Sequence, residues 1–310
     1  MKKSLPFFIL LAFCLTGADA PVFPFALIPA YAGISKLENG VSGGNTDYYS
    51  PENVLRFADY LYQEGDYLRA VGEYQRYMFL SPQEADSVLY KIGLCYRLAG
   101  DTEKAINCFR KIIAEHPESQ HCFDASYQIA YSYFISGRYQ ESSQYLDQIL
   151  KGISDPDRRG KLQILAAFNY LHQRRWREAE YMLKPLELRD EDLSRTASDL
   201  MTGAKNGLNL PRRNPAIAAL LSAIVPGTGR MYCKQYGDGF YSLILIGVTG
   251  LLAWNGFQEN GVRSIRGWFF GSMSGVFYAG NVYGSSIAAR IYNRQLETDL
   301  IKKLPAAPDK

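Results

Sequence analysis

The sequence predicts an all-α protein in which a helix-turn-helix solenoid is followed by an α-helical membrane hairpin. Two observations lead to this prediction. A short phrase that ends one helix and begins the next recurs between residues 51 and 193. Beyond residue 211, long uncharged apolar runs replace the mixed composition of the repeats. The chain of 310 residues is 47% hydrophobic and 21% charged, which suits about two domains of this kind.

Residues 1–32 have the pattern of an export signal. Lys2 and Lys3 precede an apolar run over 5–15, and small residues offer cleavage sites after Ala20 and after Ala32. Pro21 would hinder cleavage at the first site, so both remain open. Residues 33–50 then form a linker. Such a signal places the rest of the chain outside the cytoplasm, most simply in a bacterial periplasm.

The recurring phrase is clearest over residues 62–70, where one helix ends at Gly65 and the next begins at Tyr67. It returns over residues 97–105 and 134–142, and a fourth copy over 172–179 has Arg174 where the others have glycine. Aligning the copies gives repeats over 51–84, 86–119, 123–156 and 160–193, a spacing of about 34 residues. A closing helix to residue 210 completes a predicted domain over 51–210.

Small residues recur where the two helices of each repeat must touch, and large apolar residues follow at helical spacing. One such helix pair cannot bury its apolar faces alone, whereas stacked pairs share a continuous core. The small residues are Ala58 with Ala70, Gly93 with Ala105, Ala130 with Ser142, and Ala167 with Ala179.

With these packing positions and the boundary prolines, residues 51–193 resemble the tetratricopeptide repeat (TPR) family. The third and fourth repeats depart from it at the turn, and Ser142 stands where alanine is usual. The resemblance implies a concave groove, lined by the first helix of each repeat, that binds a protein or peptide. The groove positions carried over are Leu55, Asp59 and Tyr62, then Tyr90, Leu94 and Arg97, then Tyr127, Tyr131 and Phe134, then Ile164, Phe168 and His172.

These groove positions are rich in aromatic residues and poor in charge. Such a surface suits an extended or helical segment with apolar anchors, because a tyrosine offers a large contact area and a polar tip. The alternative is that some of the aromatic side chains belong to the core.

Residues 211–294 predict a membrane domain with spans near 240–257 and 267–289, followed by a polar tail over 295–310. A short apolar helix over 215–225 precedes the spans. Its length favours two crossings of the membrane, whereas the distribution of basic residues favours three, so the number remains open. The second span carries small residues four apart, which allow close packing on another helix of this chain or of a second copy. These are Gly271, Gly275, Gly280 and Gly284.

The segment from Pro226 through Gly227 and Gly229 to Tyr232 is similar to the Pro-Gly-x-Gly-x-x-Tyr turn of small bacterial helical-hairpin membrane domains. The glycines would let the backbone turn tightly at the membrane surface, with Tyr232 at the level of the headgroups. Here Cys233 and Lys234 replace the small pair common in those domains, so the second turn remains open.

The charge distribution and the motifs exclude several functions. Residues 51–193 carry a net charge of −4 and residues 194–310 one of +7, and the positive part flanks the apolar runs, so nucleic acid is not a predicted partner. His116, His121 and Cys122 lie near one boundary without a further metal ligand. With no phosphate loop, zinc-protease helix or nucleophile elbow, we expect neither an enzyme nor a cofactor.

We therefore predict a membrane-anchored periplasmic scaffold of the bacterial inner membrane that binds protein or peptide partners in envelope assembly or secretion. The alternative is a membrane-active hairpin that oligomerises or assists lipid or protein movement, with the repeats as its regulatory module. Whether any cysteines pair remains open, since no spacing among them is diagnostic.

Overall fold

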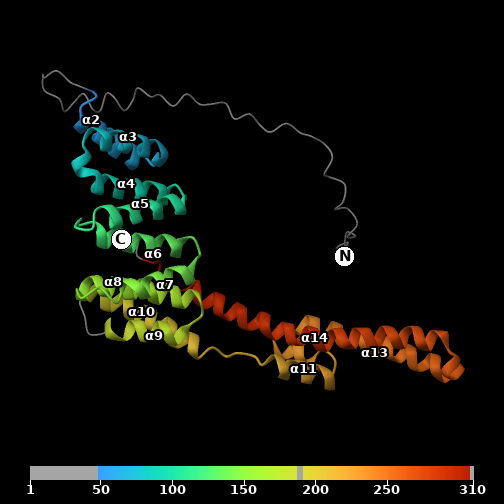
Figure 1. Ribbon diagram of the computed structural model, residues 1–310. Coiled ribbons are helices and arrows are strands. Elements are labelled where there is room, and N and C mark those ends of the chain that lie inside the picture. Colours follow the sequence, from blue (N-terminus) through green and yellow to red (C-terminus); the bar gives the residue numbers. More distant parts are fainter. Residues whose placement is uncertain (1–47, 187–190, 308–310) are drawn as a thin grey trace, which may run out of the picture. The chain divides into compact units, whose positions relative to one another are not determined.

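A computed structural model describes residues 48–186 and 191–307, and all of its described regular structure is helical (Figure 1). The predicted export signal and nearly all of the linker lie outside the described residues. Among the described residues, 48–53 belong to the first of two units, and 54–186 with 191–307 belong to the second. Of the first unit only its end is described, where the Asn53 backbone N–H donates to Ser50 Oγ at 3.4 Å.

Helix pairs follow one another in the order that the repeats predict, which confirms the TPR-type solenoid. Each helix of the array from α3 to α8 packs on the next one in sequence, and so do α8 and α9. The pairs are α2 (Pro51–Gln63) with α3 (Tyr67–Leu80), α4 (Ala85–Leu98) with α5 (Thr102–Glu115), α6 (Cys122–Ile135) with α7 (Tyr139–Ile149), and α8 (Pro156–His172) with α9 (Trp176–Leu183), closed by α10 (Glu191–Leu208).

The turn inside each repeat depends on one residue in the left-handed region of backbone space. Gly65, Gly100 and Gly137 have φ of +81°, +84° and +77°. Arg174 replaces the fourth glycine and still has φ of +61°, so the turn is kept despite the missing glycine. A side chain with a Cβ pays a conformational cost there that glycine does not.

A pair of substitutions at this turn measures that cost. Arg174→Gly should be more stable than Arg174→Ala by about 1 kcal/mol, because both remove the same side-chain contacts and only alanine keeps the Cβ. Chemical unfolding of both variants, followed by circular dichroism, gives the difference. Equal stabilities, or a more stable alanine variant, would show that position 174 does not need left-handed backbone.

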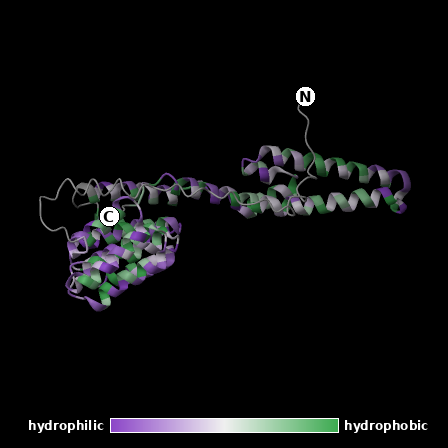
Figure 2. Ribbon diagram, turned by 90° about the horizontal axis from the view of Figure 1, so that it is seen from above, coloured by the Kyte–Doolittle hydropathy of each residue, from purple (hydrophilic) through white to green (hydrophobic). Residues whose placement is uncertain are grey.

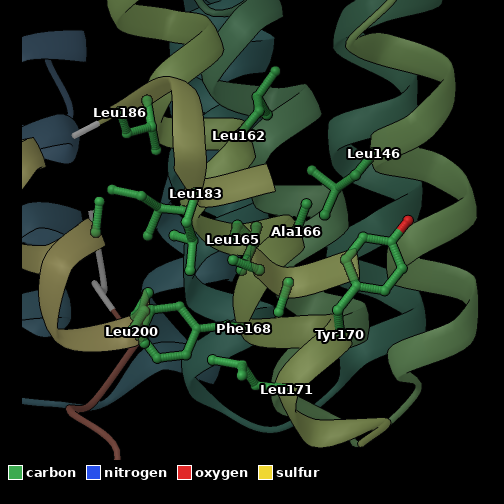
Figure 3. Packing of buried hydrophobic residues seen from close by; sticks show 14 of the residues in the cluster. Leu146, Leu162, Leu165, Ala166, Phe168, Tyr170, Leu171, Leu183, Leu186 and Leu200 are labelled. Atoms are coloured by element: carbon green, nitrogen blue, oxygen red, sulfur yellow. The ribbon is translucent and has the colours of Figure 1, made fainter. Parts of the chain in front are cut away.

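The cores of the repeats form where the small residues meet large apolar ones. A Cβ added to Gly93 would lie 2.5 Å from Phe109 Cε1, so α4 and α5 touch closely there. Figure 3 shows the corresponding packing of Leu165, Phe168 and Leu183 in the largest cluster. The helices of the array are therefore held together mainly by apolar burial.

Ser142, the departure in the third repeat, takes part in a buried polar network. Its hydroxyl donates to the Ala130 carbonyl oxygen at 2.8 Å and accepts from Asn169 Nδ2 at 2.9 Å. Asn169 Nδ2 also donates to the Leu165 carbonyl oxygen at 2.9 Å. The serine therefore links both helices of its own repeat to the first helix of the next.

Beyond the array, α13 (Tyr236–Asn260) and α14 (Ile265–Ile301) pack as an antiparallel pair joined by a short 3₁₀ turn. Gly256 lies against Gly267, and Ser274 Oγ donates to the Ile246 carbonyl oxygen at 3.3 Å, so residues pair across the hairpin in reverse order. Figure 2 colours much of this pair white to green, from neutral to hydrophobic.

Only the segment Tyr236–Arg263, among the described residues, is long and apolar enough to cross a membrane. This segment contains the predicted first span, 240–257, whose crossing of a membrane remains a prediction. The predicted second span, 267–289, does not meet the same criterion, because glycine, serine, tyrosine and Asn281 lower its hydropathy. The polar tail predicted from residue 295 instead begins inside α14, which continues to Ile301.

The predicted membrane turn connects α11 (Pro215–Ile224), α12 (Thr228–Tyr232) and α13. Gly227 has φ of +88°, and a Cβ there would lie 2.0 Å from the Gly239 carbonyl oxygen. A Cβ on Gly229 would lie 1.9 Å from the Ala218 carbonyl oxygen. Both glycines are therefore required by close backbone approach. Lys234, with φ of +64°, makes the second turn that the sequence left open.

Candidate protein-binding groove

Six predicted groove residues of the second to fourth repeats form a row of contacting side chains, which we call the aromatic row: Arg97, Tyr127, Tyr131, Phe134, Phe168 and His172. Its members are contributed by the first helices of three successive repeats. Ring centroids lie 6.1 Å apart for Tyr127 with Tyr131, 6.2 Å for Tyr131 with Phe134, 6.1 Å for Phe134 with Phe168, and 5.3 Å for Phe134 with His172. The Arg97 guanidinium carbon lies 5.2 Å from the Tyr131 ring centroid, a cation–π distance.

Tyr139 extends the aromatic row although it was not predicted as a groove residue. Its ring stacks on His172 at 4.8 Å and lies 5.6 Å from Phe134. Tyr139 begins α7, directly after the turn. Tyr67 occupies the corresponding place in the first repeat and contacts Tyr62 at 5.7 Å, so the repeat register contained a signal for this position.

Two other predicted groove residues have ring partners outside this row. The Tyr62 ring contacts Tyr67, whereas the Tyr90 ring lies 5.2 Å from His121 and 5.7 Å from Phe109. The first repeat also supplies a charge near the groove, since Asp59 Oδ1 accepts from Lys91 Nζ at 2.7 Å. The groove is therefore more polar at its first two repeats than at its last two.

Burial changes along the groove in the same direction. Tyr62, Tyr90 and Arg97 in the first two repeats are only half-buried. Tyr127, Tyr131, Phe134 and Phe168 are 4%, 6%, 9% and 1% exposed. In this conformation those four side chains pack in the core, which is the alternative that the sequence left open. The accessible groove is formed by the earlier repeats.

His172 is the titratable member of the aromatic row. Burial lowers the pKa of its imidazole below the ordinary value, so the folded protein holds it neutral at pH 7. The unfolded chain takes up a proton near pH 6.5, before the folded one does. Protonation therefore favours the unfolded state as the pH falls through that value.

We expect the free energy of unfolding of the wild type to fall as the pH drops below about 6.5. His172→Gln should fall less steeply over the same range, because glutamine does not titrate. Chemical unfolding at pH 7.5 and pH 5.5 measures both slopes. A wild-type slope equal to that of the variant would show that His172 titrates alike in both states.

The predicted helix-packing glycines divide into two groups. Gly271 lies against Phe257 and Ala253, and a Cβ on Gly284 would lie 2.6 Å from an Arg230 nitrogen. At Gly275 and Gly280, by contrast, an added Cβ would have no neighbour within 4 Å among the residues that the structure describes. The two long helices also approach closely at Gly256, where an added Cβ would lie 2.7 Å from the Gly267 backbone nitrogen, and neither glycine was among the predicted packing residues.

The polar groups around the membrane turn are held by local contacts. Ser222 Oγ and Ser285 Oγ lie 2.6 Å apart, and the Gly229 backbone N–H donates to Ser222 Oγ at 2.9 Å. The Arg213 guanidinium carbon lies 4.6 Å from the Tyr232 ring centroid. The turn from Pro226 to Tyr232 is thus held against α11, which itself contacts α14 through Ser222 and Ser285. The depth of this turn in a membrane remains a prediction.

Within residues 48–186 and 191–307, no group of three or more His, Cys, Asp or Glu side chains is arranged to hold a metal ion. The four cysteines of these ranges are free thiols, and Cys95 and Cys233 are buried.

Residues 87–119, which make up most of α4 and all of α5, match the family model described as tetratricopeptide repeat. The chain is also similar to two solved structures of nearly identical TPR-like repeats from a Podosopora anserina kinesin light chain. Their identities are 16% and 14%, both TM-scores are 0.42, and each match covers 54% of this chain and 91% or 90% of the other. No curated protein matches the chain. The TPR fold suggests a protein-interaction scaffold.

Proposed function

We propose that this protein is a membrane-anchored scaffold whose helix-pair array binds a protein or peptide partner. The observation that supports this most strongly is the half-buried part of the groove, because Tyr62, Tyr90 and Arg97 of the first two repeats offer aromatic and cationic groups there, beside the buried aromatic row. Aromatic groups and arginine are the side chains that most often dominate protein interfaces. The partner would enter along the half-buried groove of the first two repeats.

The same proposal places the array in a bacterial periplasm and the hairpin in the inner membrane, where the scaffold would serve envelope assembly or secretion. The apolar segment Tyr236–Arg263 supports the anchor. The apolar α11 and the basic residues around it are consistent with a helix at the membrane surface. The export pattern of residues 1–32 supports the periplasmic side of the membrane as the location of the array.

The location is tested with a single accessible cysteine. Phe79 is 85% exposed, so Phe79→Cys in an otherwise cysteine-free full-length chain should react with a membrane-impermeant maleimide. We expect labelling once the outer membrane alone is permeabilised. Labelling that needs disruption of the inner membrane would place the array in the cytoplasm and contradict the proposal.

Binding is tested by substitution of the accessible groove. Tyr62→Ala with Tyr90→Ala should reduce the amount of partner that copurifies with the full-length protein after crosslinking in cells. The matched control is Phe79→Ala with Tyr181→Ala, since these aromatic side chains are 85% and 76% exposed. Unchanged copurification with the folded groove variant, or an equal loss in the control, would remove the groove from the function.

The second candidate function is a hairpin that oligomerises or assists the movement of a lipid or protein. A cavity of about 520 Å³ lies among α12, α13 and α14, lined by Arg230, Asp238 and Asn281 together with apolar side chains. Gly280 also lines it, and no described residue comes within 4 Å of an added Cβ at that glycine. Under this candidate Gly280→Leu would abolish function, whereas the groove variants would leave it intact.

A further inference from the structure

The end of the chain packs on the array. Leu300 and Ile301, in the last turn of α14, lie against the same apolar cluster that contains Phe168 and Leu200, and so do Leu304 and Ala307 beyond it. In Figure 3 the faint red ribbon of the C-terminal segment passes beside Phe168 and Leu200. The C-terminal segment, which was predicted to be a polar tail, thus packs its apolar side chains against the repeats.

The C-terminal segment approaches α10 closely. A Cβ on Gly203, in α10, would lie 2.5 Å from Leu304 Cδ2. Glycine at position 203 therefore leaves the space that the leucine fills. A contact of this kind excludes water and is sensitive to the addition of a single methyl group.

Two ion pairs hold α14 about one turn before Leu300. Glu297 is a carboxylate with a side chain only 15% exposed, and it pairs with Arg174 at 3.0 Å and with Arg212 at 3.2 Å. Arg174 is the residue that keeps left-handed backbone in the turn of the fourth repeat. Arg174, which stands where the other repeats have glycine, thus also contacts α14 through Glu297.

The groove positions differ in burial along the array. The groove positions of the first two repeats are half-buried, whereas Tyr127, Tyr131, Ile164 and Phe168 in the third and fourth repeats are at most 6% exposed. All four of these residues belong to the cluster on which the C-terminal segment packs. The C-terminal segment thus packs on the part of the array that contains the most buried groove positions.

We propose that residues 297–307 are a built-in ligand of the groove at its third and fourth repeats, and that the partner resembles them. This inference rests on the proposed function and names the partner's chemistry. Glu297 is followed by Leu300, Ile301 and Leu304, an acid with apolar anchors at positions i+3, i+4 and i+7. Glu297, Leu300 and Ile301 lie in the last turns of α14 and Leu304 follows in the turn beyond it, so we expect the partner to present an acid and apolar anchors at this spacing.

The partner must then displace the chain's own segment. A tethered segment competes at high effective concentration, so the apparent affinity for a partner falls with the fraction of protein whose groove is open. Because α14 runs without interruption from the hairpin to Ile301, a shift of the hairpin would also move the segment. The hairpin would thereby set how often the groove is open.

The test uses the full-length protein in detergent micelles and a fluorescent peptide with the sequence of residues 294–307. The release variant carries Leu300→Asp and Leu304→Asp. We expect it to bind the peptide at least tenfold more tightly than the wild type, measured by fluorescence anisotropy. The matched control, Lys302→Ala with Lys303→Ala, changes two exposed side chains of the same segment and should bind like the wild type.

A second release variant controls for misfolding of the first. Glu297→Lys opposes Arg174 and Arg212 without altering the apolar core, and should also tighten peptide binding. In both release variants, hydrogen exchange should rise over residues 125–134 and 162–171. Release variants that melt cooperatively but bind no more tightly than the wild type would overturn the proposal, and so would equal tightening in the lysine control.

The outcomes separate this inference from the proposed function. If groove substitutions abolish partner copurification while the peptide never binds, the scaffold remains and the built-in ligand is wrong. If the peptide binds the release variants but no protein copurifies in cells, the built-in ligand remains and the scaffold is wrong. A peptide carrying the two leucine-to-aspartate changes should bind neither protein.

Discussion

Replacing Phe109 with alanine should lower the free energy of unfolding by about 3–5 kcal/mol, among the largest effects in the array. Phe109 is fully buried, and its ring lies directly over Gly93, where a Cβ would come within 2.5 Å. The ring also contacts Tyr90 at 5.7 Å. Its loss would leave a cavity between α4 and α5 that no neighbouring side chain can fill without a change of rotamer. Chemical unfolding followed by far-ultraviolet circular dichroism measures the change.

The same substitution on the outside of the array is the control. Phe79 is 85% exposed, so Phe79→Ala should change the free energy of unfolding by no more than about 0.5 kcal/mol. The two positions carry the same residue type and differ in their place in the repeat. Equal effects at positions 79 and 109 would mean that the repeat register assigned here is wrong.

Replacing Gly227 with alanine should disrupt the hairpin domain, with a loss of about 3 kcal/mol or more. Its φ of +88° is unfavourable for any residue with a Cβ, and the added atom would lie 2.0 Å from the Gly239 carbonyl oxygen. The clash is with backbone, so no change of rotamer can relieve it, and α11 and α13 must separate. The unfolding midpoint of the full-length protein in micelles, and protease resistance of residues 215–301, report the loss.

Gly247 provides the control within α13. An alanine Cβ there would have nothing within 4 Å, and alanine favours a helix interior over glycine by about 0.5–1 kcal/mol. Gly247→Ala should therefore leave the hairpin as stable as the wild type or slightly more so. A comparable loss at both positions would show that the turn does not depend on close approach at Gly227.

Local signals were enough to predict the array. The glycine that ends the first helix of a repeat is recognisable on its own, because it adopts left-handed backbone. In the first two repeats an aspartate follows it and caps the next helix, as when Asp101 accepts from the Lys104 backbone N–H at 3.2 Å. The regular spacing of these turns fixed the helix pairs. Even the fourth turn follows the pattern, although no sequence rule would place Arg174 in left-handed backbone.

Long-range contacts could not be predicted in this way. The repeat register assigned Tyr131, Phe134 and His172 to the groove, but it gave no information that Tyr131 and Phe134 are buried. Leu304 lies against Gly203, about a hundred residues earlier in the chain, and neither residue has a local pattern that indicates the other. The extension of α14 to Ile301 was missed because its charged turns resemble a solvated tail when they are considered alone.

The scaffold proposal is tested most directly by photo-crosslinking from the groove in living cells. A benzophenone amino acid would replace Tyr62 or Tyr90 in the groove, and Phe79 or Tyr181, whose side chains are 85% and 76% exposed, in the controls. We predict discrete protein adducts from the groove positions, lost in the presence of excess partner segment and absent from the controls. The same adducts from all four positions, or none from Tyr62 and Tyr90 in the folded protein, would contradict the assignment of the array as a protein-binding scaffold.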